Sequence, residues 1–153
     1  SEPAGLIDLP EEGNIFKSQT MGIFELPEIQ RFLGLNHFGH GRHCGALYKS
    51  LKNLEDGRQE KIAIFQNILT GIYESKRKKI QKLEIQGVEI KGACDIAEAM
   101  LLEVKRCMTS DLDLLRTQIE LAKDGQGWVL AALIAYQNGF IKGLREALEF
   151  DLI

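Results

Sequence analysis

Apolar residues recur every three or four positions over most of the chain beyond residue 58, which is the spacing of an amphipathic α-helix. The longest such segment runs from Arg58 to Leu83. Its apolar stripe consists of Ile62, Phe65, Leu69, Ile72, Ile80 and Leu83. A helix of this length would extend for nearly 40 Å, since each residue adds about 1.5 Å. The pattern therefore predicts one long helix over residues 58–83.

Strong helical signals continue towards the C-terminus. A stripe of apolar positions from Ile90 to Met108 predicts one helix, and Ser110, a favourable N-cap residue, predicts the start of another. Gly125 is typical of the left-handed residue that follows a helix. Residues 128–150 predict the last helix. Its first half is apolar on all sides, so we expect it at the centre of a bundle.

Shorter helices are predicted in the N-terminal half. Pro27 suits the first turn of a helix, which Gly34 would end soon afterwards. Residues 46–54 predict a second short helix with leucines on one side. Residues 83–92 alternate between apolar and polar positions, which fits either a tight β-ribbon or a connection between helices. A two-stranded ribbon alone is only marginally stable, so a connecting loop is the preferred interpretation.

Residues 1–24 contain two of the three prolines and no helical period, so they are predicted to form an extended arm or loop. Residues 25–153 are expected to form a single helical bundle domain, because no repeat or second domain is visible. The fold class is thus predicted to be all-α, a helical bundle of about five helices with an extended N-terminal arm.

The composition is that of an ordinary globular domain, since 44% of the 153 residues are hydrophobic and 27% are charged. The longest uncharged apolar run, Trp128 to Tyr136, is far shorter than the roughly 20 residues of a membrane-spanning helix, so no transmembrane segment is predicted. The first residues do not resemble a secretory signal peptide. Three widely spaced cysteines do not form a disulfide framework, and an intracellular, cytoplasmic location is expected.

The chemically most distinctive segment holds all three histidines, His37, His40 and His43, together with Cys44. Imidazole and thiolate groups bind transition metals and transfer protons near neutral pH. Zinc is the metal that such ligands would bind, but structural zinc sites usually combine two well-separated ligand pairs. The interspersed glycines favour a loop. The preferred interpretation is therefore a loop with surface histidines and a small buried cysteine, and no cofactor is expected.

A catalytic role for the same segment would require Cys44 to act as a nucleophile that a neighbouring imidazole activates. The sequence indicates neither a third residue to orient the imidazole nor an oxyanion donor. A di-metal carboxylate centre would need Glu-x-x-His pairs on helices, and the chain has none. A non-enzymatic protein is therefore preferred.

A basic cluster interrupts the apolar stripe of the long predicted helix. It consists of Lys76, Arg77, Lys78, Lys79 and Lys82. Such a cluster can bind nucleic acid or anionic lipid. It can also be a solvated helix end, where cations complement the negative end of the helix dipole. The side chains would project around the whole helix with only Tyr73 as an aromatic neighbour, so the solvated helix end is preferred.

Small residues occupy every fourth position along part of the last predicted helix: Ala131, Ala135, Gly139 and Gly143. Such a row lets a neighbouring backbone approach closely. Each glycine costs about 1 kcal/mol of helix propensity relative to alanine, so packing has to compensate. Internal helix–helix packing is the preferred interpretation, and a self-association seam is the alternative.

The function predicted from these observations is a non-enzymatic helical protein–protein interaction module that is oligomeric. In the second hypothesis the chain binds a polyanion, either nucleic acid or anionic lipid, through the basic cluster. In the third it is a metal-binding or thiol enzyme at His37–Cys44.

Overall fold

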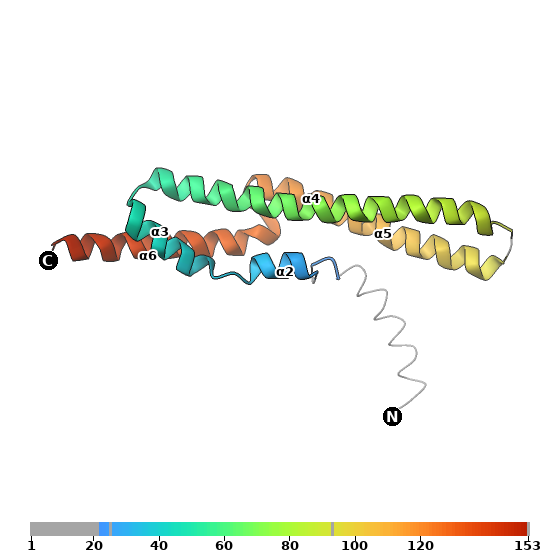
Figure 1. Ribbon diagram of the computed structural model, residues 1–153, viewed down its shortest axis with the longest axis horizontal. Coiled ribbons are helices and arrows are strands. Elements are labelled where there is room, and N and C mark those ends of the chain that lie inside the picture. Colours follow the sequence, from blue (N-terminus) through green and yellow to red (C-terminus); the bar gives the residue numbers. More distant parts are fainter. Residues whose placement is uncertain (1–21, 25, 93, 153) are drawn as a thin grey trace, which may run out of the picture. The chain divides into compact units, whose positions relative to one another are not determined.

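A computed structural model describes residues 22–24, 26–92 and 94–152. Within them the chain forms five α-helices and no strand, so the predicted all-α class is confirmed (Figure 1). The helices are α2 (Pro27–Leu33), α3 (His37–Tyr48), α4 (Leu51–Ile90), α5 (Asp95–Lys123) and α6 (Leu130–Leu152). A short 3-10 helix, η1 (Gly127–Val129), leads into α6. The predicted arm over residues 1–24 lies outside the described residues, except for a turn at 22–24.

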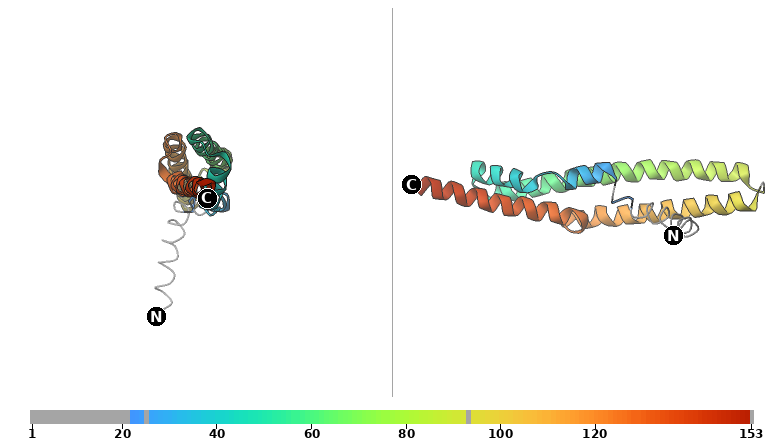
Figure 2. Two further views of the ribbon diagram at one scale, coloured as in Figure 1. Left: turned by 90° about the vertical axis from the view of Figure 1, so that its left-hand side faces the viewer. Right: turned by 90° about the horizontal axis from the view of Figure 1, so that it is seen from below.

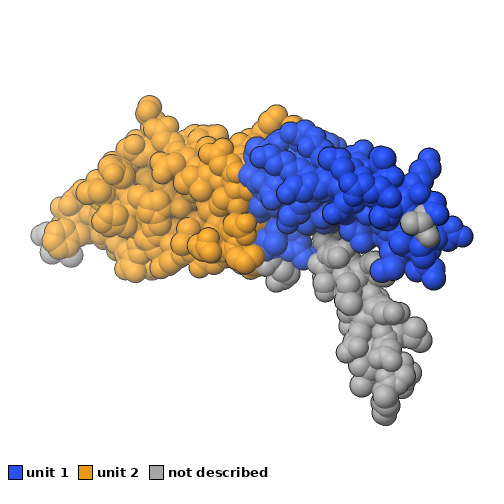
Figure 3. All heavy atoms as spheres, turned by 45° about the vertical axis from the view of Figure 1, so that its right-hand side comes forward, with its two compact units in different colours: residues 1–26, 70–117 blue, residues 27–69, 118–153 orange. Residues whose placement is uncertain are grey.

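The chain divides into two compact units (Figure 3). Unit 1 comprises Ser1–Leu26 and Thr70–Thr117, and unit 2 comprises Pro27–Leu69 and Gln118–Ile153. The boundary thus falls within α4 and within α5, so each of these helices contributes to both units. That residues 25–153 form one domain stays a prediction. No helix of the described part of the chain is both long and apolar enough to cross a membrane.

In unit 1 the second part of α4 and the first part of α5 lie side by side as an antiparallel hairpin (Figure 2). The buried side chains include Ile72, Ile80, Cys107, Leu112 and Leu115. The loop predicted for residues 83–92 is wrong, because α4 continues to Ile90. Gly87 faces α5 there, and a methyl group at this position would lie 3.1 Å from a methyl carbon of Leu101. The glycine therefore serves close helix packing and does not end the helix.

The helix start predicted at Ser110 is also wrong. α5 is continuous from Asp95 to Lys123, and Ser110 is an exposed residue within it. The reason is the stripe of buried positions 111, 115, 118 and 122, which has helical spacing and gives α5 no cause to break. Gly125 has a positive φ of 70° just beyond the helix, and its predicted left-handed conformation is confirmed.

Unit 2 contains α2, α3, the first part of α4, the end of α5, η1 and α6. Phe65 of α4 and Phe140 of α6 are fully buried, and the rings of Phe32 and Phe65 join α2 to α4 with centroids 5.1 Å apart. The expectation that the first half of α6 is buried on all sides is wrong. Leu133 is only 1% exposed, but Ile134 is 50% exposed.

α3 corrects the predicted loop around the histidines and the predicted helix over residues 46–54. Asn36 caps the start of α3 by accepting a hydrogen bond of 2.8 Å from the backbone N–H of Gly39. Lys49, with a φ of 53°, ends α3, and α4 begins at Leu51. Residues 46–54 therefore belong to two helices with a turn between them.

Close contact with α6 explains why the glycines of this segment are helical. Added Cβ atoms at Gly41 and Gly45 of α3 would overlap backbone atoms of α6. Conversely, added Cβ atoms at Gly139 and Gly143 of α6 would overlap the backbone of α3. Each helix thus presents glycines to the other, and the two backbones lie in direct contact over this pair of helices. The packing stabilises a helix that its own sequence favours only weakly.

Candidate functional site

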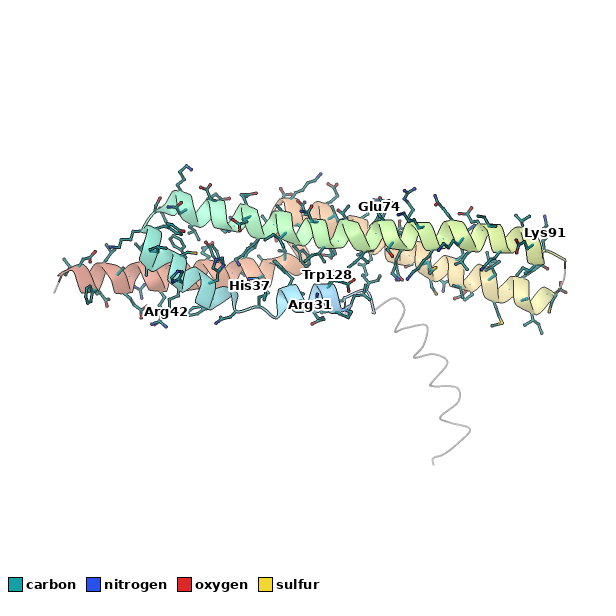
Figure 4. The ribbon with its side chains drawn as sticks, viewed as in Figure 1. Arg31, His37, Arg42, Glu74, Lys91 and Trp128 are labelled. Carbon is teal, nitrogen blue, oxygen red and sulfur yellow. The ribbon has the colours of Figure 1, made fainter. Side chains whose placement is uncertain are left out.

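α3 distributes the predicted His/Cys cluster around its circumference. His37 is buried at 3% exposure, whereas His40 and His43 are exposed. Cys44 is half-buried and, like His40, lines a cleft in unit 2. Figure 4 shows His37 and Arg42 on this helix beside α6. Of the four predicted ligands, His40 and Cys44 therefore line the cleft, whereas His37 and His43 are not part of its lining.

Both ring nitrogens of His37 are hydrogen-bonded. Nε2 donates to the backbone oxygen of Phe32 at 2.7 Å, because a carbonyl can only accept. Nδ1 must then accept, and it lies 3.0 Å from Nζ of Lys61. Burial lowers the pKa of His37 below its ordinary value, and the charge of Lys61 also disfavours the protonated ring. His37 is therefore a neutral, structural acceptor for a buried lysine.

Lys61, like Tyr136, is a residue of this site that the sequence did not indicate. It comes from α4, is 7% exposed, and lies with Nζ 4.9 Å from the centre of the Tyr136 ring. Burial lowers its pKa. The available signal was its helical register with Phe65 and Leu69, four and eight residues later, which places Lys61 on the apolar stripe of α4.

Tyr136 of α6 lines the same cleft, and its side chain reaches α4. Its hydroxyl group occupies the space in front of Gly57, where an added Cβ would overlap the hydroxyl oxygen. The ring of Tyr136 lies 5.4 Å from that of His40. Burial raises the pKa of Tyr136 to about 12, with a further contribution from the neighbouring Cys44. Tyr136 is therefore a neutral hydrogen-bonding group near pH 7.

The cleft has a volume of about 570 Å³, which is within the range of small-molecule sites. Its lining combines polar groups with the apolar side chains of Phe32, Leu35 and Ile64. The charged groups lie at different depths: Lys61 is buried, whereas Asp56 and Glu60 are exposed. The cleft thus has a positive group at its base and negative groups at its rim.

The predicted metal ligands do not assemble in the described part of the chain. Among residues 22–24, 26–92 and 94–152, no three His, Cys, Asp or Glu side chains are grouped so that they could hold a metal ion. His37 offers no free nitrogen lone pair, as shown above. The three cysteines are free. His40 and Cys44 at the cleft retain the chemistry that the sequence indicated, but without the other two predicted ligands.

The members of the basic cluster differ in whether they form ion pairs. Lys76 lies 3.4 Å from the buried carboxylate of Asp111, and Arg77 pairs with Glu74 at 2.9 Å. Lys78, Lys79 and Lys82 are exposed, and none forms an ion pair with another described residue. Three of the five predicted polyanion-binding side chains, Lys78, Lys79 and Lys82, are therefore both exposed and without an ion-pair partner among the described residues.

The small residues on α6 differ in how deeply they are buried. Gly139 and Gly143 are buried against α3, Ala135 is half-buried and Ala131 is exposed. A bidentate ion pair from Arg42 to Glu146, at 2.7 and 2.8 Å, accompanies this contact of α3 with α6. Gly41 and Gly45 are the partners that the sequence analysis missed. Their spacing of four residues, equal to that of Gly139 and Gly143, was the signal for them.

A shallow apolar groove lies on the hairpin of unit 1. It has a volume of about 350 Å³ and is lined by residues of both helices, Leu83, Gly87 and Val88 of α4 and Leu101 and Leu102 of α5 among them. Val88 is 78% exposed and Leu102 is 69% exposed. We refer to it below as the hairpin groove.

Comparison with known proteins adds no further information. The chain matches no protein family, no curated protein and no solved structure at a significant level.

Proposed function

We propose that the protein is a non-enzymatic helical interaction module whose unit 1 hairpin pairs with the same hairpin of a second copy. The observation that carries this proposal is the exposed apolar surface of the hairpin groove, together with the opposite charges of two successive segments of the hairpin. Ile85, Ile96 and Met100 add further exposed apolar surface to the same hairpin, at exposures between 64% and 70%. Exposed apolar surface of this kind on a polar background is typical of protein interaction sites.

The charges of the hairpin support a second copy of this chain as the partner. Residues 74–82, the stem segment, contain five basic residues and one acidic residue. Residues 84–103, the tip segment, contain five acidic residues and one basic residue. Figure 4 labels one minority charge in each segment, Glu74 in the stem and Lys91 at the hairpin turn. The hairpin therefore carries two adjacent patches of opposite sign.

Antiparallel pairing brings each stem segment against the tip segment of the other copy. A two-fold axis near the groove residues Leu83 and Gly87 places the apolar groove at the centre of the contact. Parallel pairing would instead place basic stem against basic stem, and like charges would repel. A closed two-fold contact also buries the same surface on both copies.

The experiment is analytical ultracentrifugation of the whole chain. We expect a dimer for the wild type and a monomer for Val88→Glu combined with Leu102→Glu, which introduces charge into the groove. Both side chains are largely exposed, so the fold should persist, as far-ultraviolet circular dichroism would check. Leu51→Glu, at 72% exposure in unit 2, is the matched control and should remain dimeric.

Two charge variants test the antiparallel arrangement. Lys78→Glu with Lys82→Glu neutralises the stem segment, and Glu89→Lys with Glu98→Lys neutralises the tip segment. Each variant alone should dimerise more weakly than the wild type. In a mixture of the two variants, the unchanged stem of one can pair with the unchanged tip of the other, which restores one of the two attractive contacts. A heterodimer should therefore form in preference to either homodimer.

Three results would contradict the proposal: a monomeric wild type, a groove variant that dimerises like the control, or stronger dimerisation when the stem is neutralised. A wild-type monomer that binds duplex DNA or anionic vesicles with a steep dependence on salt would instead favour the polyanion hypothesis for Lys78, Lys79 and Lys82.

A further inference from the structure

Among the described residues, the ammonium group of Lys61 has no carboxylate partner in an ion pair. The ion pairs of the described residues include none for Lys61, and its hydrogen-bond partner there is the neutral ring of His37. An ammonium group has three N–H donors, and a buried charge without an opposite charge is costly. The same side chain lines the unit 2 cleft. The cleft therefore contains a buried cation, and a ligand with a carboxylate group would supply its missing ion-pair partner.

The other polar groups of the cleft are arranged by depth. The hydroxyl of Tyr136 and the thiol of Cys44 lie with Lys61 in the lining, and both can donate hydrogen bonds. Glu60 and Asp56 are exposed and carry negative charge. Asp56 pairs with Lys52 at 3.2 Å, whereas Glu60 forms no ion pair with any described residue. A purely anionic ligand would bind Lys61 but would meet the repulsion of Glu60 at the rim.

We propose that the unit 2 cleft binds a small zwitterion, whose carboxylate pairs with Lys61 and whose ammonium group faces Glu60. The apolar side chains of Phe32 and Ile64 would contact the carbon skeleton between the two charges. The volume of about 570 Å³ accommodates a molecule the size of an amino acid. The neutral state of His37 is consistent with this role, because it holds Lys61 in place without neutralising its charge.

Electrostatics favour a ligand of both charges over one of a single charge. Burial lowers the pKa of Lys61, and a bound carboxylate would favour its charged form. Hydrogen bonds to ionised groups are roughly twice as strong as those between neutral groups. Binding at both ends therefore distinguishes a zwitterion from compounds that carry only one of its two charges.

The test uses isothermal titration calorimetry with four related probes. Norleucine and 6-aminohexanoate carry both charges at different separations, hexanoate carries only the carboxylate, and hexylamine carries only the ammonium group. We expect at least one zwitterion to bind and the single-charge probes to bind at least about tenfold more weakly, as expected for the loss of one charged hydrogen bond.

Two variants connect binding to the named residues. Lys61→Met and Glu60→Gln should each weaken binding of the preferred zwitterion by about tenfold or more. Glu60 is exposed, so Glu60→Gln should fold normally even if Lys61→Met does not. Lys142→Met and Glu28→Gln, which change the same residue types outside the cleft, should bind like the wild type.

The proposal is overturned if neither zwitterion binds more tightly than about 10 mM, the range of negligible affinity. It is also overturned if hexanoate or hexylamine binds as tightly as both zwitterions. Unchanged binding in Glu60→Gln would remove the rim carboxylate from the site and with it the reason for a zwitterion.

Discussion

Substitution of Gly143 by alanine tests the direct backbone contact of α3 with α6. Alanine is the best helix former, and in an exposed helix the change from glycine would stabilise the protein by about 1 kcal/mol. At this position we predict the opposite sign. The added Cβ would lie 2.7 Å from the carbonyl carbon of Arg42 and 3.0 Å from its Cα, and it would overlap the carbonyl oxygen.

The magnitude follows from the size of this overlap. Carbon atoms in contact are normally about 3.5–4.0 Å apart, so α3 must move by about 1 Å. A shift of that size removes a quarter to a half of the attractive energy of the atoms it separates, and insertion of a methyl group into a packed core usually costs about 1–3 kcal/mol. The obstacle is backbone and cannot rotate away, so the cost should lie near the upper limit. After the gain of about 1 kcal/mol in helix propensity is subtracted, the expected net loss in the free energy of unfolding is about 2 kcal/mol.

Urea unfolding followed by circular dichroism measures this loss as a fall in the midpoint. Gly71 is the matched control, because it is a helical glycine of α4 whose added Cβ would have no atom within 4 Å. Gly71→Ala should stabilise the protein by about 0.5–1 kcal/mol. If Gly143→Ala stabilised the protein as Gly71→Ala does, the backbones of α3 and α6 could not be in contact at Arg42.

Two further predictions concern buried charges. Lys76→Met should lower the free energy of unfolding by about 3 kcal/mol or more, because it leaves the Asp111 carboxylate buried without a cation. Asp111→Asn should lower it little or raise it, because burial disfavours the charged carboxylate and raises the pKa of Asp111. Urea unfolding at pH 7 measures both, and the reverse order would contradict the buried pair. Burial lowers the pKa of His37 below 6.5, so the unfolded state binds more protons in this range and stability should fall as the pH falls below that value. Unfolding midpoints measured from about pH 7 to pH 5 should fall less in His37→Gln, and an equal fall would show that His37 titrates normally in the folded state.

The hydrophobic pattern was sufficient to predict the helical class and the cores of most helices. It predicted the stripe of α4 because Ile62, Phe65 and Leu69 interact with the rest of the protein through one face, and the spacing of that face is visible in the sequence. Helix ends were harder to predict. Ser110 has the side chain of an N-cap, but the buried position next to it, Asp111, continues the stripe of α5.

The candidate site could be predicted only in part, because its geometry depends on contacts between helices. His40 and Cys44 were indicated by their chemistry, and both line the cleft. Lys61 was not, since a lysine in an amphipathic helix is normally solvated and its burial depends on His37, which is distant in the sequence. The glycines of α3 were interpreted as signs of a loop because the low helix propensity of glycine can be read from the sequence. Their contact with α6, which compensates for that low propensity, cannot be read from it.

The four contact glycines, Gly41, Gly45, Gly139 and Gly143, also have an evolutionary consequence. Every other residue type carries a Cβ, so only glycine fits at these positions as long as the two helices keep their spacing. Exposed His43 is under no comparable packing constraint and is free to drift. A distant relative of this protein should therefore keep two glycine pairs, each spaced by four residues and about a hundred residues apart, even where His43 is replaced.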